Sequence, residues 1–391
     1  MPWKEVKPME QKLLFIADHL RRVANFSTLC KSYGISRRTG YKWLNRYRQL
    51  GLYGLQNQSR CPKTKPLKTP YCVREAIIKL RREYKDPPGA KKIKVLLQQE
   101  HPDWDIPSKT TIHKILLEAE LVTPRKSRRR VPIHPQPFAP VDKPNQVWSA
   151  DFKGQFKTAD GKWCYPLTIM DHHSRYLLAC RTLSATTTDD TMAIFDQLFR
   201  QHGLPERIRT DNGAPFASSG LAGLSHLSKW WIRLGIAPER IMPGKPQQNG
   251  RHERMHSTLK KAAITPAADN AQQQQKAFDH FIDTYNHKRP HESLGQRPPA
   301  TVYTASSKNM PEKLPELDYP AHFNICLVNH NGVIYHLKHR VYIACLLKGE
   351  KVGLEQTSDT QWNVYFANIK LGHFDMSDIT TDRNGYISLN V

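Results

Sequence analysis

Apolar residues recur at helical spacing through the first 120 residues, and at the alternating spacing of strands after residue 145. The first part of this pattern predicts helices over Glu10–Arg22, over Phe26–Ser32 and after a cap at Ser36. Further helices are predicted over Val73–Lys85, Ala90–Gln99 and Ser108–Glu120, with proline-containing breakers between them. The chain is therefore expected to start with two groups of three short helices.

Beyond Asn145 the pattern is typical of an α/β domain. Strands are predicted over Gln146–Phe156, Trp163–Asp171, Tyr176–Ser184, Arg207–Thr210 and near Arg240. Helices are predicted over Thr188–His202, near Leu224–Leu234, and over Asn249–Ala263 and Gln272–Tyr285. The tail from Phe323 to Val391 holds short β-like runs at Val333–Leu337, Val341–Leu346 and Trp362–Phe366. These runs indicate a small β-barrel.

The changes in pattern predict a multidomain protein. We expect all-α domains at residues 1–55 and 71–123, an α/β domain at 146–300 and a small β-barrel at 320–391. Residues 56–70 and 124–145 are rich in proline and basic side chains and lack apolar periodicity, so they are expected to be linkers.

The charge of the chain indicates a polyanionic partner. Of its 391 residues, 59 are Lys or Arg and 35 are Asp or Glu, which gives a net charge of +24. Residues 1–145 hold 31 of the basic and 12 of the acidic residues, so most of the excess lies in the helical part. The second linker contributes Arg128, Arg129 and Arg130, which would bind phosphates without reading sequence.

Length, apolar runs and cysteine placement exclude several classes of protein. The chain is longer than the roughly 100–200 residues of one domain, so it is not a single small binding module. Its longest apolar run, Val341–Leu347, is far shorter than the ~20 residues of a membrane-spanning helix. The seven cysteines are scattered without a CxxC pair, which argues against a disulfide framework and a zinc ribbon. We expect a cytoplasmic protein.

The helix after Ser36 has two different faces. With the turn Tyr33-Gly34-Ile35 before it, this helix is expected to be the third of a helix-turn-helix motif. Its apolar side consists of Trp43, Leu44 and Tyr47. The other side carries side chains that can read base edges in the major groove, namely Arg37, Arg38, Lys42, Asn45 and Arg46. The alternative is a surface helix whose charges are only solvated.

The second helical group also has the composition of a DNA-binding unit. Its lysines are available for contacts with phosphates, namely Lys91, Lys92, Lys94, Lys109 and Lys114. The alternative is a helical spacer whose charges only keep it in solution.

Three carboxylates stand where an active site at a sheet edge would need them. Asp151 lies on one face of a predicted strand, opposite the apolar Trp148. Asp211 directly follows a short strand, and Glu253 lies on the polar face of a helix that also presents Lys260. Three oxygen donors from separate elements suit Mg²⁺ or Mn²⁺. Two such ions would clamp an in-line displacement at phosphorus.

Each of these residues also has an ordinary alternative role. An Asp before Asn-Gly is often a turn former, and a Glu on a basic helix is often a solvated ion-pair partner. Four histidines lie near the same motifs, His172, His173, His252 and His256. We assign them structural or DNA-contacting roles rather than metal ligation, because neutral imidazole competes poorly for a hard cation.

The carboxylates lie in the segments VWSADF, RTDNGAPF and PGKPQQNGRHERMHSTLK, and YNHKRPHESLG follows them. These segments resemble the catalytic core shared by retroviral integrases and bacterial insertion-sequence transposases of the DDE type. The resemblance covers essentially the whole chain and is strongest in the core. It implies an RNase H-like fold for residues 146–300 and places the metal-binding, catalytic triad of the family on Asp151, Asp211 and Glu253.

Two departures from the family refine the resemblance. The spacing from Asp211 to Glu253 is longer than is typical, which indicates an insertion at Ser218–Leu227. The start of the chain has no His-His-Cys-Cys zinc module and carries helix-turn-helix units instead, which favours the bacterial transposase branch.

The resemblance implies a transposase that binds the terminal inverted repeats of its element through residues 1–120. It would cleave the 3′ ends and join them to target DNA, using two Mg²⁺ (or Mn²⁺) ions. Lys260, Asn249 and Gln247 would contact DNA near the cleaved end. The implied partners are double-stranded DNA, as terminal repeats and as target, and further copies of the chain on DNA in a bacterial nucleoid. The alternatives are a non-catalytic sequence-specific DNA-binding regulator and a structure-selective nuclease.

Overall fold

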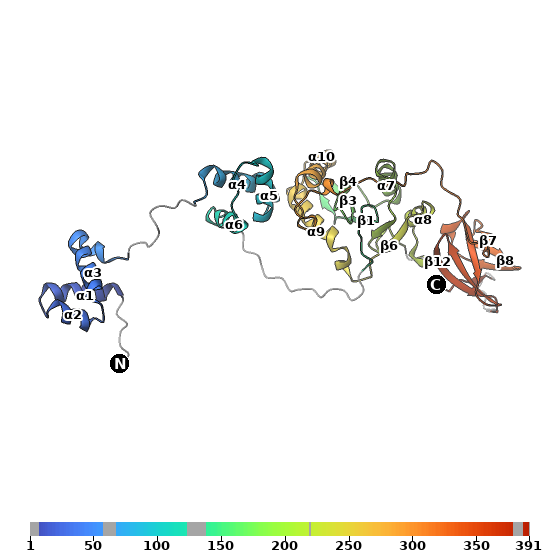
Figure 1. Ribbon diagram of the computed structural model, residues 1–391. Coiled ribbons are helices and arrows are strands. Elements are labelled where there is room, and N and C mark those ends of the chain that lie inside the picture. Colours follow the sequence, from blue (N-terminus) through green and yellow to red (C-terminus); the bar gives the residue numbers. More distant parts are fainter. Residues whose placement is uncertain (1–7, 58–67, 123–137, 219, 378–385, 391) are drawn as a thin grey trace. The chain divides into compact units, whose positions relative to one another are not determined.

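The computed structural model describes residues 8–57, 68–122, 138–218, 220–377 and 386–390 (Figure 1). The chain divides into two units, Met1–Lys68 and Thr69–Val391. Most of each predicted linker lies outside the described residues, and so do Arg128, Arg129 and Arg130. In the described parts of the chain, no helix is both long enough and apolar enough to cross a membrane.

The first unit contains the three helices that its apolar periodicity predicts. They are α1 (Pro8–Leu20), α2 (Phe26–Ser32) and α3 (Arg37–Leu50), followed by a 3₁₀ turn, Gly51–Leu55. The Ser36 hydroxyl accepts a hydrogen bond from the Thr39 amide at 3.2 Å, so the cap predicted for the third helix is present. Phe15, Leu29 and Leu44 are buried together and hold the three helices against one another.

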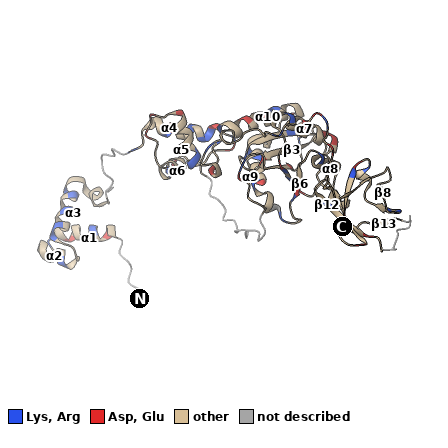
Figure 2. Ribbon diagram, turned by 45° about the vertical axis from the view of Figure 1, so that its right-hand side comes forward, with Lys and Arg blue, Asp and Glu red and all other residues tan. Residues whose placement is uncertain are grey.

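Helix α3 has the two faces that its sequence predicts. Leu44 is buried, and Trp43 is half-buried beside it. The opposite face exposes Arg37, Arg38, Lys42 and Asn45. Arg46 is half-buried, with its guanidinium carbon 5.2 Å from the centroid of the Trp43 ring. Basic residues therefore recur along this helix (blue in Figure 2), while its apolar side anchors it.

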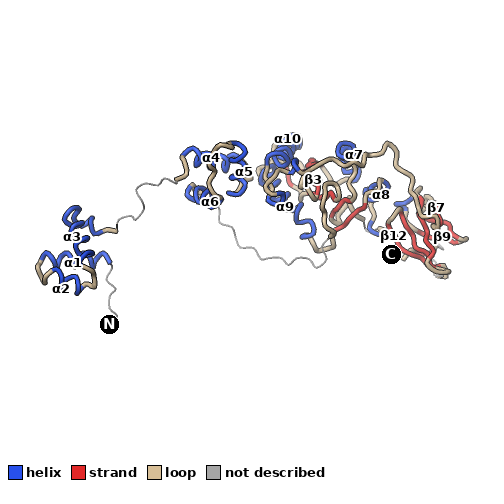
Figure 3. Tube along the Cα trace, in the orientation of Figure 1, coloured by secondary structure: helices blue, strands red, loops and turns tan. Residues whose placement is uncertain are grey.

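The second helical group is also present (Figure 3). It consists of α4 (Tyr71–Glu83), α5 (Ala90–Glu100) and α6 (Lys109–Glu118). Ile77, Leu97 and Ile112 are fully buried at its centre. The Ser108 hydroxyl caps α6 by accepting a hydrogen bond from the Thr111 amide.

A six-stranded mixed sheet forms the centre of the α/β domain. Its strand order is β2-β3-β1-β5-β6, and β4 also pairs with β3. The strands are β1 (Val147–Phe152), β2 (Phe156–Lys157), β3 (Trp163–Asp171), β4 (Leu177–Leu183), β5 (Arg207–Thr210) and β6 (Ala237–Arg240). Strand β1 pairs antiparallel with β3 and parallel with β5, so it lies in the middle of the sheet.

Helices cover both faces of this sheet. They are α7 (Thr188–His202), α8 (His226–Arg233), α9 (Gly250–Leu259) and α10 (Ala271–Asp283), and the last two continue into π-helical turns at Lys260–Ile264 and Thr284–Lys288. On one face Trp148 packs with Phe195 of α7 and Trp231 of α8. On the other face Met170 packs with Met255 of α9. The sheet is therefore the middle layer of three.

The C-terminal part forms two open sheets, and the predicted β-barrel is not confirmed. The sheets have the orders β12-β11-β10-β7 and β13-β9-β8. Their strands are β7 (Asn324–Leu327), β8 (Val333–His336), β9 (His339–Tyr342), β10 (Lys351–Gln356), β11 (Gln361–Phe366), β12 (Ile369–Asp375) and β13 (Ile387–Ser388). Each sheet keeps two edge strands, so the described residues do not close a barrel. The strand predicted over Val341–Leu346 ends at Tyr342, and the chain then turns into a 3₁₀ helix at Cys345–Leu347.

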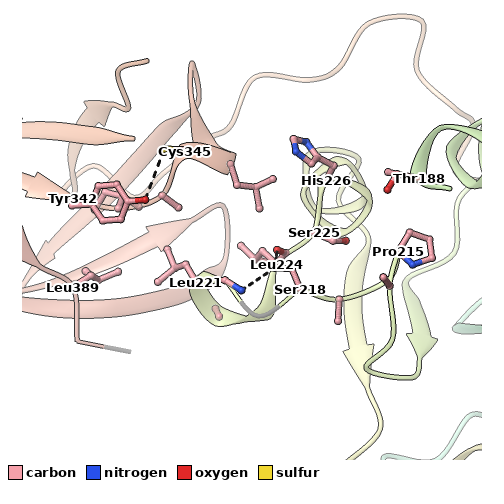
Figure 4. A pocket seen from close by; sticks show the side chains of 17 residues that line it. Thr188, Pro215, Ser218, Leu221, Leu224, Ser225, His226, Tyr342, Cys345 and Leu389 are labelled. Carbon is pink, nitrogen blue, oxygen red and sulfur yellow. Dashed lines mark hydrogen bonds between the residues drawn. The ribbon is translucent and has the colours of Figure 1, made fainter. Parts of the chain in front are cut away.

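The C-terminal sheets share a hydrophobic core with the α/β domain. Leu224 and Ile232, before and within α8, belong to the same buried cluster as Phe366. A hollow of about 990 Å³ lies at this junction, with Pro215 on one side and Tyr342 on the other (Figure 4). The segment at Ser218–Leu227, expected to be an insertion, therefore supplies part of the surface on which the C-terminal sheets pack.

Charged side chains hold the same junction. Glu350 pairs with Arg233 and Lys229 of α8, and its side chain is only 13% exposed. Arg233 also donates to the Pro315 carbonyl at 3.0 Å, and Lys229 donates to the Leu346 carbonyl at 3.1 Å. Because these charges are partly buried, removing one partner should cost more free energy than breaking a surface ion pair would.

We expect Glu350→Gln to loosen this junction. The substitution leaves Arg233 and Lys229 partly buried without their anionic partner, which should cost about 1–3 kcal/mol. Hydrogen exchange of the full-length protein should become faster in α8 and β10. Lys351→Gln is the matched control, because it removes an exposed pair with Glu316 worth about 0.2–1 kcal/mol. Equal exchange rates in the two variants would contradict the anchoring role of Glu350.

Candidate active site

Two of the three carboxylates leave the sheet at the same edge. Strands β1 and β5 are parallel, with Val147 opposite Arg207 and Ser149 opposite Arg209. Continuing this register by two residues sets Asp151 opposite Asp211. Neighbouring strands lie about 4.8 Å apart, so the pairing of these strands is what brings the two carboxylates together.

The ionisation of Asp151 reflects this crowding. The pKa of Asp151 is raised to about 7. Burial is the main cause, the negative charge of Asp211 is the next, and that of Glu253 adds to them, while Lys153 opposes the rise. The other two carboxylates that the sequence singles out therefore both lie close enough to act on Asp151.

The Asp211 side chain lies in a turn that two hydrogen bonds hold in place. Its Oδ1 accepts a hydrogen bond from the Gly213 amide at 3.1 Å. The next side chain, Asn212, donates to the Ile241 carbonyl just beyond β6 at 2.8 Å. Asp211 therefore does form a turn, as the alternative interpretation proposed, and its half-buried carboxylate still remains at the carboxyl edge of the sheet.

Glu253 lies in the first turn of α9 and projects away from the core. Met255 and Leu259 are buried against the sheet, whereas Glu253, Ser257 and Lys260 are exposed. The polar face predicted for this helix is therefore present. Its carboxylate is held by the packing of the opposite side of the helix, not by hydrogen bonds of its own turn.

A buried hydrogen-bond network links α9 to the strands behind Asp151. The Thr168 hydroxyl on β3 lies 2.7 Å from Nε2 of His252 and 2.7 Å from Nε2 of His256. It also donates to the main-chain carbonyl of Asp151 at 2.9 Å. The Ser149 hydroxyl lies 2.8 Å from Nδ1 of His252. These contacts fix the helix that carries Glu253 against the strand that carries Asp151.

Both histidines in this network are neutral. Burial lowers the pKa of His256 to about 3, with a smaller contribution from the charge of Lys153. Burial also holds the pKa of His252 well below its usual range. Both rings therefore enter the hydrogen-bond network without a charge.

Three residues of this site were not singled out by the sequence. Ser149 could have been noticed, because it is a polar residue two positions before Asp151 and so on the same face of the strand. Lys153 lies two positions after Asp151 and is equally visible. The part played by Thr168 follows from the pairing of β1 with β3, which sets it opposite Asp151. The sequence around Thr168 does not indicate which strand β3 pairs with.

The donor set fits hard divalent cations. Asp151, Asp211 and Glu253 offer carboxylate oxygens from three separate elements, which is the ligand type that Mg²⁺ and Mn²⁺ prefer. Burial, and after it the negative charges of Asp211 and Glu253, raise the pKa of Asp151 and so disfavour its ionised form. A bound cation would favour that form.

The residues predicted to contact DNA near this site differ in accessibility. Lys260 and Gln247 are exposed. Asn249 is only 3% exposed, and its Oδ1 has no hydrogen-bond partner among the described residues. In this arrangement the side chains of Lys260 and Gln247 are accessible to DNA, whereas Asn249 is buried in the turn before α9.

Comparison with known domains agrees with this architecture. Residues 141–246 and 234–299 each match an integrase core domain. Residues 9–56 and 39–116 each match a homeodomain-like domain. The α/β part of the chain is therefore an integrase core domain, and helix-turn-helix-type domains precede it.

The relatives include proteins of bacterial insertion elements. The chain is 26% identical over 214 residues to the uncharacterized 39.2 kDa protein of insertion element IS476 from Xanthomonas euvesicatoria, covering 54% of this chain and 59% of that protein. It is 25% identical over 191 residues to the uncharacterized 31.7 kDa protein of IS407 from Burkholderia multivorans, covering 48% and 66%. The match thus spans less than two thirds of either relative. The resemblance to insertion-sequence transposases with an integrase-like core is confirmed.

Retroviral proteins are also similar to the chain. The Gag-Pol polyprotein of baboon endogenous virus is 27% identical over 172 residues, covering 44% of this chain and 9% of the polyprotein. Among solved structures, the HTLV-2 integrase catalytic core in complex with magnesium matches with a TM-score of 0.33 and 16% identity, covering 41% and 98%. A simian T-cell lymphotropic virus intasome matches with a TM-score of 0.37 and 17% identity, covering 71% and 93%. Scores of this size do not by themselves establish a common fold.

We expect Asp151→Asn to stabilise the metal-free protein at alkaline pH. The pKa of Asp151 is about 7 in the folded chain against 3.8 ordinarily, so the folded state binds more protons than the unfolded state between these values. Stability therefore falls as pH rises through this window, by roughly 3–4 kcal/mol in all. The variant lacks this loss, so its advantage should be near zero at pH 4 and complete at pH 8.

Thermal unfolding in the presence of a chelator measures this difference. Asp359→Asn, which removes an exposed turn carboxylate, is the control for the loss of one charge. A stability gap between Asp151→Asn and the parent that is the same at pH 4 and pH 8 would show that the Asp151 carboxyl is not desolvated and crowded as described.

Proposed function

We propose that the protein is a DNA transposase that cuts the 3′ ends of its own element and joins them to target DNA. The observation that carries the proposal is that the charges of Asp211 and Glu253 both act on the largely buried carboxylate of Asp151, within a stretch that matches an integrase core domain. A protein that only bound DNA would have no use for a largely buried carboxylate with two further negative charges near it.

In this proposal the three carboxylates hold two divalent cations, Mg²⁺ or Mn²⁺. Bound there, the cations would supply charge stabilisation at the scissile phosphate and a more acidic attacking hydroxyl. Asp151 is proposed as the shared ligand, because its carboxylate interacts with both Asp211 and Glu253. The hydrogen-bonded turn at Asp211, and the packing of α9 against the sheet at Glu253, would keep the ligands in place before DNA binds.

The same site would perform two successive displacements at phosphorus. In the first, a water oxygen bonds to the phosphorus at the element end, and the P–O3′ bond breaks to free a 3′-hydroxyl. In the second, that hydroxyl bonds to a phosphorus of target DNA, and the target strand leaves with its own 3′-hydroxyl. The bonds formed and broken are of the same type, and no side chain becomes covalently attached.

Recognition of the terminal inverted repeats is proposed for helix α3. Arg37, Arg38, Lys42 and Asn45 are exposed on one side of a helix anchored from the other side. Arg128, Arg129 and Arg130 would add contacts with phosphates between the domains, and Lys260 would hold DNA beside Glu253. Pairing two element ends calls for more than one copy of the chain on the DNA.

We expect substitution of any one carboxylate to stop both reactions. Asp151→Asn, Asp211→Asn and Glu253→Gln should each lower 3′-end cleavage and strand transfer by about 10³-fold or more, because several kcal/mol of charge stabilisation is lost at tenfold per 1.4 kcal/mol. The measurement uses end-labelled repeat DNA and a target plasmid in Mg²⁺. Binding of the repeat in a gel shift should be unchanged.

Asp189→Asn at the exposed start of α7 is the matched control, and it should cut and join normally. Strand transfer by Asp151→Asn in Mg²⁺ would defeat the proposed triad. A wild-type protein that shifts the repeat but never nicks it would be a regulator, and one that nicks it without joined products would be a nuclease.

We expect Asn45→Ala to weaken binding of the terminal repeat selectively. Loss of one paired contact with a base should cost about 1–3 kcal/mol on the specific repeat and little on unrelated DNA. Fluorescence anisotropy at several salt concentrations separates the two effects. Gln11→Ala, at an exposed position of α1 in the same unit, is the control. An equal loss on both DNAs would assign Asn45 to phosphate contact instead.

A further inference from the structure

His252 and His256 share one hydroxyl group with the backbone behind Asp151. Nε2 of each ring lies 2.7 Å from the Thr168 hydroxyl oxygen, and the same oxygen lies 2.9 Å from the Asp151 main-chain carbonyl. A hydroxyl has one proton to donate and two lone pairs that accept. Three neighbours at hydrogen-bond distance therefore leave little freedom in how the protons are placed.

One arrangement satisfies all three contacts. The carbonyl of Asp151 can only accept, so Thr168 donates its proton there, and both imidazole rings donate from Nε2 to the hydroxyl oxygen. If Thr168 instead donated to one ring, the Asp151 carbonyl would lose this donor. The neutral rings thus carry their proton on Nε2 and a lone pair on Nδ1.

The two Nδ1 atoms have different surroundings. The Ser149 hydroxyl lies 2.8 Å from Nδ1 of His252 and 3.3 Å from the Met170 main-chain carbonyl. Donation to the nearer atom, Nδ1, uses both nitrogens of His252. Nδ1 of His256 lies 3.8 Å from Oδ2 of Asp151, too far for a hydrogen bond. No described residue makes a hydrogen bond to it. Nδ1 of His256 and Oδ2 of Asp151 are therefore neighbours without a hydrogen bond between them.

The separation of these two atoms suits a shared metal ion. Nitrogen and oxygen ligands lie about 2.0–2.2 Å from small divalent cations, so one ion can contact both atoms at 3.8 Å from each other. The ligand atoms of Asp151, His252 and His256 all lie within 4.8 Å of one another. The proton assignment removes His252 from this group and leaves a pair, with the Asp151 side chain 21% exposed on the open side.

We propose that His256 is a nitrogen ligand, through Nδ1, to the divalent cation held by Asp151. This rests on the proposed metal-holding role of Asp151 and adds a fourth side chain to the carboxylate triad. It revises the assignment made from the sequence, in which none of the histidines binds metal. Thr168 then acts as a positioning residue, because its hydroxyl fixes the tautomer that turns the lone pair of His256 toward the ion.

A nitrogen ligand has a consequence for metal preference. Mg²⁺ strongly prefers oxygen ligands, whereas transition-metal ions also accept imidazole. His256 should therefore raise the affinity for Mn²⁺ more than the affinity for Mg²⁺. This distinguishes a ligand from a residue that only packs against Asp151, which would affect both ions alike.

Pulsed electron paramagnetic resonance of the wild-type full chain loaded with Mn²⁺ tests the ligand directly. Protein labelled with ¹⁵N-histidine should show coupling of a ring nitrogen to the Mn²⁺ spin. This readout needs no substitution and no DNA cleavage. Absence of nitrogen coupling in a sample that binds Mn²⁺ would overturn the proposal.

His256→Gln is the matched variant, because its amide can still donate near the Nε2 position to Thr168 but offers nothing at Nδ1. Its Mn²⁺ affinity should fall by about 10-fold, the lower end of what the loss of such a group costs a metal site. Its Mg²⁺ affinity should fall by less than about 3-fold, since Mg²⁺ gains little from imidazole. Isothermal titration calorimetry measures both affinities, and an equal loss for the two ions would contradict direct ligation.

Two further variants separate the possible failures. His252→Gln removes a neighbour with no free ligand atom, so the nitrogen coupling should persist in it. Asp151→Asn should abolish tight binding of both ions. If Asp151→Asn loses the metal while His256→Gln binds Mn²⁺ like the wild type, the inference about His256 is wrong and the proposed function stands. If Asp151→Asn still binds both ions tightly, the metal site of the proposed function itself is wrong.

Discussion

The parallel pairing of β1 with β5 is the constraint on which the rest of the site depends. This pairing places Asp151 and Asp211 at equivalent positions on neighbouring strands. Asp151 is largely buried there, and the charge of Asp211 disfavours its ionisation. Isolated in water, such groups would move apart. Here Trp148 and Met170 pack on opposite faces of the sheet and hold the strands in place, so burial and the nearby charge of Asp211 keep the pKa of Asp151 raised. A bound cation would stabilise the ionised form of Asp151.

The remaining parts of the site serve to keep a helix in contact with that edge. Glu253 is exposed and has no rigid partner of its own, so its position depends on how α9 lies on the sheet. Apolar packing through Met255 and Leu259 sets the distance of the helix from the sheet. The polar network at Thr168 sets its rotation, because directional hydrogen bonds resist sliding in a way that apolar contacts do not.

Much of the core could be predicted because its signals are local. The bounds predicted for β3, α7 and β5 are those observed, since each ends at a cap or turn that the sequence displays. Asp151 and Asp211 were found through the motifs around them. The link between Thr168 and His256 could not be, because it requires knowledge of strand pairing and of the helix lying across it. Short alternating runs in the tail likewise predict strands but not whether their sheets close into a barrel.

The stretch from Asp211 to Ser218 connects the carboxylate edge to the hollow beneath the C-terminal sheets. Its first residue is a proposed metal ligand, and Pro215 and Ser218 line the hollow at the junction with the C-terminal sheets. Modules joined in this way are not freely interchangeable. A different C-terminal domain joined to this core would pack against a surface that is shaped for the present one. A poor fit there would shift the backbone only a few residues from Asp211. Swapping such tails among related proteins should therefore demand compensating changes in this one stretch.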